Sequence, residues 1–363
     1  MIRSVALLLF SSLAFAACGR DATEYRLGMA GPFTEGFGLA NRRGAELALA
    51  EINAAGGING TPLSIDFRDD GGDGSRAASI AQEFVDDVRI SGVVGHVTSG
   101  AMVAAAKVYD GQLAALATTA SSAELTSISR WVFRVISSDS ANGVDLARFA
   151  ERLGKRRAYV LYENDAYGRG LADAFRRTFG GAVLGFDPID AEGRDAEVFV
   201  AWAAKERADL IFVAGTERSG LALLRAARAQ GLSADFLGGD GWTGVAAEPA
   251  VSEGALVGAP FTARDPRADA QRFVQAFEAK FGVEPDGNAA LAYDATWVMA
   301  AALRSAGADR GKLRDWLASR TMRSPVPGVT GNIAFELSGD PVGKSLVMTR
   351  VRGGQLIPTQ ESR

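Results

Sequence analysis

Hydroxyl side chains gather in two short loops of this sequence, at residues 95–100 (GHVTSG) and 118–122 (TTASS). Each loop follows an apolar run, and the first precedes a helical one. Thr98 and Ser99 are therefore expected at a helix N-terminus, where outward-pointing backbone N–H groups bind carboxylates. Helix capping is the simpler explanation of either loop alone. Two such loops at the carboxyl ends of neighbouring strands, where open parallel sheets bind ligands, favour a binding site.

Catalytic and metal chemistry is limited by the residue counts. His96 is the only histidine and Cys18 the only cysteine, which excludes His-rich zinc sites, Cys-His dyads and the H-E-x-x-H helix. A Ser-His-Asp triad would need His96, and no serine lies in a G-x-S-x-G elbow. We therefore expect no enzyme activity, no metal and no cofactor. We interpret His96 as a strand-end residue that supplies hydrogen bonds near the ligand site.

The glycine-rich and acidic segments have simpler explanations than chemistry. Residues 71–74 (GGDG) lack the Lys-Ser/Thr pair of a P-loop, and residues 168–170 (GRG) lack the third glycine of a dinucleotide fingerprint. The acidic pairs at 69–70 and 86–87 could act as general acids or bind a metal, but charged pairs at element ends are usually solvated. We interpret the glycine segments as turns.

The size and charge of the chain bound its organisation and partners. With 363 residues, of which 47% are hydrophobic, the chain exceeds what one hydrophobic core usually serves, so two domains are expected. The net charge is -4, and no dense run of Lys or Arg could neutralise a row of phosphates. Nucleic acid is therefore not expected as a partner.

The first residues resemble an export signal. Arg3 precedes an apolar run at 5–10 and small residues at 13–17, which predicts a signal peptide over 1–17. Residues 15–18 (FAAC) resemble the bacterial lipoprotein box, in which Cys18 receives the lipid, although Phe15 replaces the usual leucine. Cleavage by the A-x-A rule would instead release a soluble protein beginning at Ala17, and a buried unmodified cysteine is a third alternative. Residues 18–23 then form a polar linker.

Short apolar runs alternate with longer amphipathic ones through most of the remaining chain. Strands are expected at 25–29, 63–68, 92–95, 158–162, 210–213 and 256–259. Helices are expected at 41–54, 75–87, 102–109, 142–153, 170–178, 197–205, 219–229 and 267–281. This alternation is typical of α/β proteins, in which helices cover both faces of parallel sheets. Near the C-terminus, alternation at 332–336 and 346–352, joined through 339–340 and followed by a Gly353-Gly354 turn, predicts strands added antiparallel to one sheet.

The order and spacing of several motifs resemble the leucine/isoleucine/valine-binding family of type I periplasmic binding proteins, which deliver solutes to ABC transporters. The motifs are 27–34 (LGMAGPFT), 44–48 (GAELA), 51–60 (EINAAGGING), 67–70 (FRDD), 165–170 (DAYGRG), 238–242 (GGDGW), 293–295 (YDA), 331–335 (GNIAF) and 339–340 (GD). They extend over nearly all of the chain after residue 23. Their ordered succession is more specific than any single motif.

The resemblance implies how the carboxylate of a ligand is held. Ser99, or its neighbour Thr98, matches the hydroxyl that holds the carboxylate, assisted by the backbone at Thr119 and the hydroxyl of Ser121. A zwitterion that enters a dry cleft loses its hydration, so its carboxylate needs N–H and O–H donors.

The resemblance also implies how the rest of an amino acid is held. Asp240 matches the acidic residue that pairs with the ligand ammonium, Tyr167 an aromatic that closes over the ligand from the second lobe, and Phe37 an aromatic that packs from the first lobe. A turn role for Asp240 and ordinary packing for Tyr167, Phe37 and Trp242 are the alternatives. Thr216 stands where branched-chain amino-acid binders often have tyrosine, which leaves the preferred side chain open.

The implied fold is α/β, with two doubly wound, Rossmann-like lobes joined by a three-stranded hinge. Lobe 1 is expected to comprise 24–137 plus 260–325, and lobe 2 to comprise 138–259 plus 326–363. The chain would cross between them near Ser137, near Ala259 and at 324–331.

The implied function is that of an extracytoplasmic substrate-binding component of an ABC importer, which captures a branched-chain or related amino acid by hinge closure. Its partners would be the small ligand and the transporter permease, with the protein a monomer that touches the membrane only through a lipid on Cys18. A periplasmic sensor of amino acids or amides, acting on a receptor, would share the fold. An enzyme on a Rossmann-like fold would need a nucleophile, metal or cofactor motif.

Overall fold

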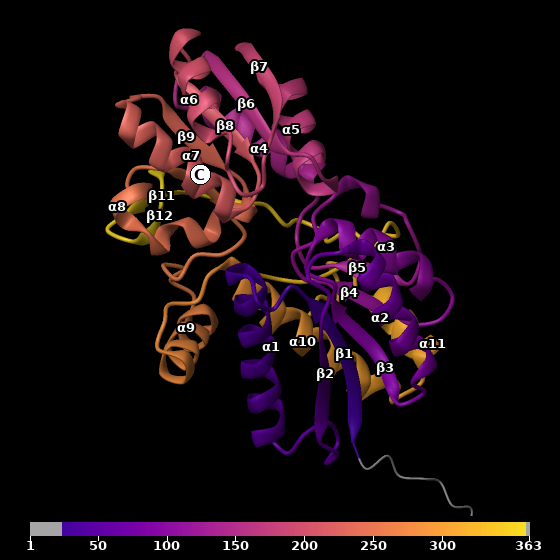
Figure 1. Cartoon of the computed structure of the whole chain (residues 1–363). Coiled ribbons are helices and arrows are strands. Elements are labelled where there is room, and N and C mark those ends of the chain that lie inside the picture. The colour runs from indigo at the N-terminus through magenta and orange to yellow at the C-terminus, as the bar shows by residue number, and fades with distance from the viewer. Residues whose placement is uncertain (1–23, 361–363) are drawn as a thin grey trace, which may run out of the picture.

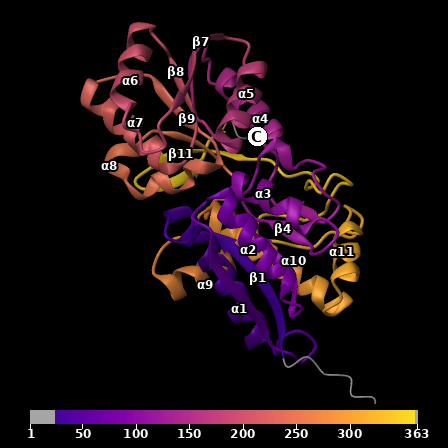
Figure 2. The ribbon, with the colours of Figure 1, turned by 45° about the vertical axis from the view of Figure 1, so that its right-hand side comes forward.

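A computed structural model describes residues 24–360, so the predicted signal peptide at 1–17, Cys18 and the whole of the linker predicted at 18–23 lie outside the described residues. The described chain forms two lobes, each built on a largely parallel sheet with helices on both faces (Figures 1 and 2). This is the predicted α/β fold class. Between residues 24 and 360, no helix is both long enough and apolar enough to span a bilayer.

Lobe 1 contains a five-stranded parallel sheet in the order β2-β1-β3-β4-β5. Its strands are β1 (Tyr25–Gly31), β2 (Leu63–Asp69), β3 (Ile90–Gly95), β4 (Ala115–Ala117) and β5 (Val132–Arg134). One face packs against α1 (Gly36–Ala54), α10 (Gly287–Ala306) and α11 (Arg310–Ala318), and α9 (Ala268–Phe281) lies beside α1. The other face packs against α2 (Gly74–Asp86) and α3 (Ser99–Tyr109), and the short helix η1 (Ala123–Leu125) follows β4.

Lobe 2 contains a seven-stranded sheet in the order β12-β11-β10-β9-β8-β6-β7. Its strands are β6 (Arg157–Glu163), β7 (Ala182–Ile189), β8 (Leu210–Ala214), β9 (Asp235–Gly238), β10 (Leu256–Ala259), β11 (Val347–Arg352) and β12 (Gln355–Pro358). In this sheet β11 runs antiparallel to both of its neighbours, β10 and β12, and the other described pairs are parallel. The covering helices are α4 (Asp139–Arg152) and α5 (Ala166–Thr178) on one face, and α6 (Ala196–Lys205), α7 (Glu217–Gln230), η2 (Asp240–Ala247) and α8 (Pro249–Ser252) on the other.

Local sequence explains where many helices begin. An N-cap side chain accepts a hydrogen bond from a backbone N–H in the first turn of several helices, which satisfies one of the donors that the helix leaves open. These caps are Asp73 for α2, Ser138 for α4, Asp165 for α5, Asp286 for α10 and Asp309 for α11. Every predicted strand and helix of the alternating region overlaps an observed one.

The prediction at the C-terminus is partly wrong. Residues 332–336 are not a strand: they form only isolated bridges, between Val326 and Ile333 and between Phe335 and Pro341. Ile333, Ala334 and Phe335 are all buried, and Ile333 and Phe335 rest on the core of lobe 1. The antiparallel addition itself exists, since β11 pairs with β10, and the predicted Gly353-Gly354 turn joins β11 to β12.

The chain passes between the lobes three times. Two passages follow β5 and β10, next to the predicted positions near Ser137 and Ala259. The third comes later than the predicted 324–331, because Phe335 still packs in the core of lobe 1 and Leu346 is the next residue in a core of lobe 2. Residues 326–341, expected in lobe 2, therefore lie with lobe 1.

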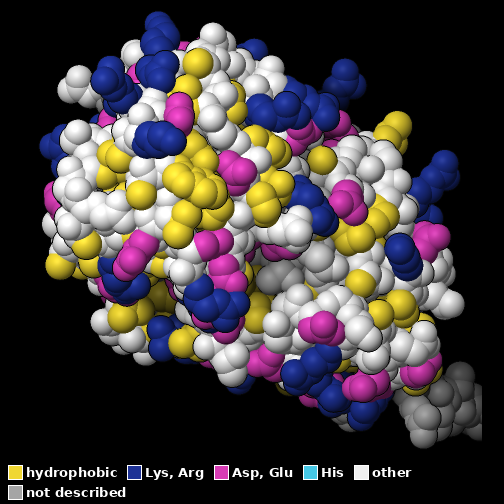
Figure 3. All heavy atoms as spheres, turned by 45° about the horizontal axis from the view of Figure 1, so that its top comes forward, with side chains coloured by type: hydrophobic (Ala, Val, Ile, Leu, Met, Phe, Trp, Pro, Cys, Tyr) yellow, Lys and Arg dark blue, Asp and Glu magenta, His cyan; other side chains and the backbone are white. Residues whose placement is uncertain are grey.

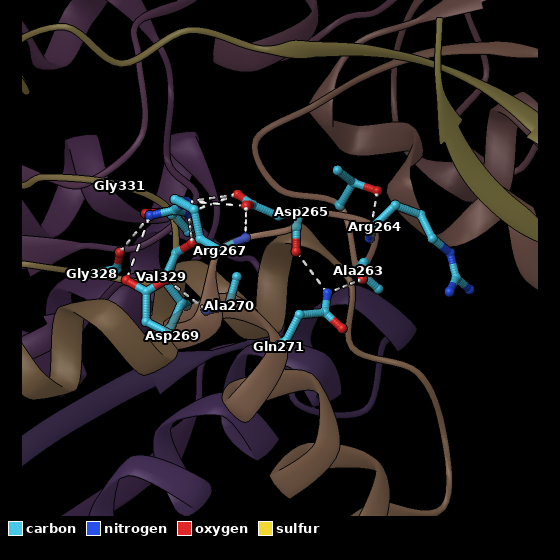
Figure 4. Close-up of polar contacts among 12 residues, drawn as sticks. Ala263, Arg264, Asp265, Arg267, Asp269, Ala270, Gln271, Gly328, Val329 and Gly331 are labelled. Carbon is cyan, nitrogen blue, oxygen red and sulfur yellow. Dashed lines mark hydrogen bonds and ion pairs between the residues drawn. The ribbon is translucent and has the colours of Figure 1, made fainter.

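The second passage is held by a set of polar contacts (Figure 4). Arg267 binds Asp265 and donates to the carbonyl oxygens of Gly328, at 3.3 Å, and Val329. The Gln271 amide donates to the carbonyls of Ala263 and Asp265 at 2.9 and 2.7 Å. These bonds tie the segment that leaves lobe 2 to the start of α9.

The strand orders place a topological switch point in each lobe. In lobe 1, β1 lies between β2 and β3, and in lobe 2, β6 lies between β7 and β8. Loops at the carboxyl ends of such strands diverge to opposite faces of the sheet and leave a crevice where ligands bind. The loops after β1, β3, β4, β6, β8 and β9 are therefore the expected ligand-binding loops.

Candidate functional site

A small cavity of about 70 Å³ lies where the carboxyl-end loops of both lobes meet. Its lining residues are Phe37, Val97, Thr98, Ser99, Thr119, Asp165, Tyr167, Thr216, Asp240, Gly241 and Asn288. Seven of the eight predicted ligand-binding residues are in this set. The eighth, Ser121, does not line the cavity but is fully buried next to it.

Lobe 1 presents donors to the cavity. Thr98 precedes the first turn of α3, but its hydroxyl makes no capping bond, and its buried Oγ1 has no hydrogen-bond partner among the described residues. Ser99 Oγ accepts from the Ser122 N–H at 3.1 Å, which leaves the Ser99 hydroxyl hydrogen free to donate. The capping explanation therefore fits Ser122, which caps η1, but not Thr98.

The loop that carries Thr98 and Ser99 is held by buried hydrogen bonds of His96, the single histidine. His96 Nδ1 lies 2.7 Å from Asp70 Oδ2, and His96 Nε2 lies 2.9 Å from the Tyr109 hydroxyl, with all three side chains fully buried. Thr119 Oγ1 donates to the Val97 carbonyl at 2.8 Å. His96 is thus a strand-end residue that supplies hydrogen bonds, as predicted, and it holds the Thr98 loop in place.

The second loop of lobe 1 is fixed by a buried arginine. Arg134 Nη1 donates to the carbonyls of Ser121 and Ser122, both at 2.8 Å. The same guanidinium binds Asp340 Oδ1 at 2.6 Å. Since Asp340 lies just before the third passage, Arg134 links the loop beside the cavity to the hinge.

Lobe 2 presents a carboxyl group to the cavity. Asp240 is 6% exposed, and its Oδ1 accepts from the Tyr167 hydroxyl at 3.3 Å. The Tyr167 oxygen accepts in turn from the Gly241 N–H at 3.0 Å. Burial raises the pKa of Asp240 to about 6, against the hydrogen bond from Tyr167 and the nearby Ser121 hydroxyl, which lower it. A carboxylate in such a place gains from a cation in the cavity.

The hydroxyl of Thr216 is already engaged. Glu163 Oε1 accepts from the Thr216 N–H and Oγ1, both at 2.8 Å, and from Ser219 Oγ at 2.7 Å. Because the Thr216 hydroxyl donates its hydrogen to Glu163, it can only accept from a ligand. Burial raises the pKa of Glu163, with these hydrogen bonds opposing the shift.

The aromatic predictions divide into two kinds. Phe37, in the first turn of α1, and Tyr167, at the start of α5, line the cavity from opposite lobes. Trp242 is fully buried and does not line it. Trp242 packs so closely on Gly238 that an added Cβ there would lie 2.1 Å from the indole ring. The packing explanation holds for Trp242.

Asn288 is a lining residue that the sequence did not suggest. Its Nδ2 donates to Thr243 Oγ1 at 2.9 Å, which joins α10 of lobe 1 to η2 of lobe 2. Arg218 and Glu35 form an ion pair between the lobes near the same edge. The sequence signal that could have identified Asn288 is the N-cap residue Asp286, which marks the start of α10 two residues before it.

The cleft widens beside this cavity. A second cavity of about 480 Å³ is lined by Gly36 and Glu217, the sequence neighbours of Phe37 and Thr216, and by residues of α9 and β12.

Within residues 24–360, no three His, Cys, Asp or Glu side chains are grouped so that they could hold a metal ion. On the face shown in Figure 3, basic and acidic side chains are interspersed.

Comparisons with known proteins agree with this geometry. Residues 25–355 match the family model of the periplasmic binding proteins. The leucine-, isoleucine-, valine-, threonine- and alanine-binding protein of Pseudomonas aeruginosa is 32% identical over 352 residues, which cover 92% of each chain.

Two solved structures share the architecture. An ABC transporter substrate-binding protein of Desulfitobacterium hafniense in complex with Leu is 30% identical, with a TM-score of 0.80 over 93% of this chain and 100% of that one. The branched-chain amino acid transporter substrate-binding protein of Streptococcus pneumoniae in complex with isoleucine is 27% identical, with a TM-score of 0.84 over 92% and 97%. This chain belongs to the periplasmic binding protein family and has its two-lobed, type I fold.

Proposed function

We propose that this chain is the substrate-binding component of an ABC importer and captures an amino acid, branched-chain or related, between its lobes. The observation that carries the proposal is the pairing of opposite chemistries across one cavity. Thr98 and Ser99 offer hydroxyl donors at the N-terminus of α3, and Asp240 offers a buried carboxyl on the facing lobe. An α-amino acid carries the complementary carboxylate and ammonium groups.

The class of ligand is supported by the relatives. The Pseudomonas protein is described as binding leucine, isoleucine, valine, threonine and alanine, and the two solved structures hold Leu and isoleucine. The small volume and the aromatic walls of Phe37 and Tyr167 suit a compact, mostly apolar side chain. Thr216 adds one hydrogen-bond acceptor, which suits ligands with a short hydroxyl side chain such as threonine.

Binding proceeds by closure of the lobes without chemical conversion of the ligand. The carboxylate first meets the donors of lobe 1, where Thr98, Ser99 and the Thr119 backbone lie together. Closure then brings Tyr167 and Asp240 onto the ammonium, and the Asn288 to Thr243 bond joins the lobes. A ligand that contacts both lobes shifts the equilibrium toward the closed form, which a permease recognises.

The proposal also specifies where the protein acts and how it is anchored. The protein acts outside the cytoplasm, after removal of the predicted signal peptide, as a monomer that delivers its ligand to a permease. A diacylglyceryl group plus an N-acyl chain on Cys18 would supply more than the two membrane signals that stable anchoring needs. Mass spectrometry of the natively purified protein tests this: a diacylglyceryl-modified N-terminal cysteine supports the anchor, and an unmodified Ala17 N-terminus contradicts it.

Isothermal titration calorimetry with the twenty common L-amino acids tests the function. We expect at least one branched-chain or small amino acid to bind with a one-to-one stoichiometry. Asp240→Ala should weaken that ligand at least about 100-fold, because the buried partner of its ammonium is lost. Asp235→Ala, at the start of β9, serves as a control that keeps full affinity. Equal affinity of Asp240→Ala and the wild type would refute the assignment of the ammonium.

A further inference from the structure

A second buried carboxyl group, that of Asp139, lies near Asp240 but does not line the cavity. Asp139 opens α4 immediately after the first passage between the lobes, and its side chain is fully buried. Neither of its carboxyl oxygens has a well-formed hydrogen bond among the described residues. The Ser121 hydroxyl is near enough to Asp139 and Asp240 to lower the pKa of each. Two buried carboxyls therefore share one hydroxyl neighbour.

The surroundings of Asp139 are dominated by acidic and neutral groups. The titratable and polar groups that face it, directly or through Tyr167, are Ser121 after β4, Arg134 of β5, Glu163 of β6, Asp165 and Tyr167 at the start of α5, and Asp240 of η2. Arg134 is the only cation in this set. Its guanidinium is already bound to Asp340 and to two carbonyl oxygens. The pair therefore lacks a dedicated counter-ion.

Two carboxyls in this position cannot both ionise at low cost. Burial, followed by the nearby charge of Asp240, raises the pKa of Asp139 well above its usual value. Burial raises the pKa of Asp240 only to about 6. Asp240 Oδ1 accepts from the Tyr167 hydroxyl, whereas neither Asp139 oxygen has a donor among the described residues, so the shared proton belongs on Asp139 and the charge on Asp240, as in other dyads of interacting carboxyls.

We propose that Asp139 is the proton-carrying partner of Asp240, and that entry of a ligand ammonium drives this proton from Asp139 into the solvent. The inference rests on the proposed function. In this step the O–H bond of the Asp139 carboxyl breaks, the ammonium stays protonated, and the buffer takes the proton. The pair changes from one negative charge to two, of which the ligand cation neutralises one. Asp139 is thus a positioning residue that acts through Asp240.

The proposal defines a class of ligands. A primary ammonium supplies both the positive charge and the N–H donors that the Asp240 carboxylate needs. A carboxylic acid of the same shape without an amine brings a further negative charge and no cation. The cleft should therefore reject acids such as 4-methylpentanoate, which is leucine without its amino group, by at least about 100-fold relative to L-leucine.

Calorimetry of L-leucine binding in buffers of different ionisation enthalpy measures the proton released. At pH 7 we expect about one proton to leave the wild type, and affinity to rise with pH between 5.5 and 7. Asp139→Asn should bind leucine with almost no proton release. Asp145→Asn changes another partly buried carboxyl with a raised pKa on the same helix, so it should release as many protons as the wild type.

Two results would overturn the inference: leucine binding without proton release in the wild type, or unchanged release in Asp139→Asn. Failure of leucine to bind would count against the proposed function instead. In that case a pH titration of the ¹³C-labelled aspartate carboxyls of the ligand-free wild-type protein tests the inference. The Asp139 signal should stay protonated at pH 7, and an ionised Asp139 at that pH would refute the proposal even if Asp139→Asn fails to fold.

Discussion

Some hydroxyl groups at the cavity have no hydrogen-bond partner in the protein, and others already donate their hydrogen to a protein acceptor. Thr98 Oγ1 is buried without a partner, while Thr119 and Thr216 donate their hydroxyl hydrogens within the protein. Hydroxyl-rich loops were enough to predict Thr98 and Ser99 from the sequence. Asp139 and Asn288 were not predicted, because their importance arises from neighbours more than 90 residues away or on the other lobe.

The unpartnered hydroxyl of Thr98 gives a test that separates binding from stability. Thr98→Val keeps the shape of the side chain and removes the hydroxyl. Because a hydrogen bond to a charged carboxylate is worth about 1.5–3 kcal/mol, we expect affinity for the best amino acid to fall about 10-fold or more. Thermal unfolding without ligand should be unchanged or slightly raised, since Oγ1 has no partner to lose. A variant that loses stability and keeps its affinity would assign Thr98 a structural role.

The raised pKa of Asp240 predicts how its charge affects folding. Between the unfolded value near 3.8 and the folded value of about 6, the folded chain binds more protons than the unfolded one. Stability of the ligand-free protein is therefore lost as pH rises through this window, and the loss is complete above it. Asp240→Asn removes this cost, on the order of 3 kcal/mol.

Chemical denaturation of ligand-free wild type and Asp240→Asn from pH 4 to 8 measures the difference. The advantage of the variant should grow up to about pH 7 and then stay level. An advantage that does not depend on pH would mean that Asp240 is not desolvated as the structure indicates.

At the scale of elements, the apolar periodicity predicted the strands that are buried on both faces. β3 and β8 are fully buried, and β8 reads as a continuous apolar run while β3 is interrupted only by Ser91. β7 was not predicted, because this edge strand is only partly buried and contains Gly185 and Pro188. α10 was also not predicted: it is buried nearly all round, so it lacks the polar face that marks an amphipathic helix.

The packing of α1 on α10 depends on one glycine. A Cβ at position 44 would lie 2.1 Å from the Ala289 carbonyl oxygen, so Gly44→Ala should force the helices apart and lower the free energy of unfolding by about 1–3 kcal/mol. Gly100→Ala is the matched control, because nothing lies within 4 Å of the added methyl. It should leave stability unchanged or raise it by up to about 1 kcal/mol. Denaturant titration compares the two, and equal stabilities would contradict the close helix contact.

At the scale of the whole molecule, the resemblance predicted two lobes, three passages and a cleft, and the position of the third passage was wrong. The motif at 331–335 identified the segment, but only its packing on lobe 1 shows where the chain leaves. Short-range patterns do not report such long-range contacts. The cavity itself forms only when loops from six strands meet, so it could be predicted as a set of residues but not as a volume.

A crystal structure of the protein grown with its strongest-binding amino acid tests the central claim most directly. We predict one ligand molecule between the lobes, with its ammonium nitrogen within about 3.2 Å of an Asp240 carboxyl oxygen. Its carboxylate should lie within the same distance of the hydroxyl of Thr98 or Ser99. A ligand bound outside this cavity, or bound in it with its carboxylate toward Asp240, would contradict the account.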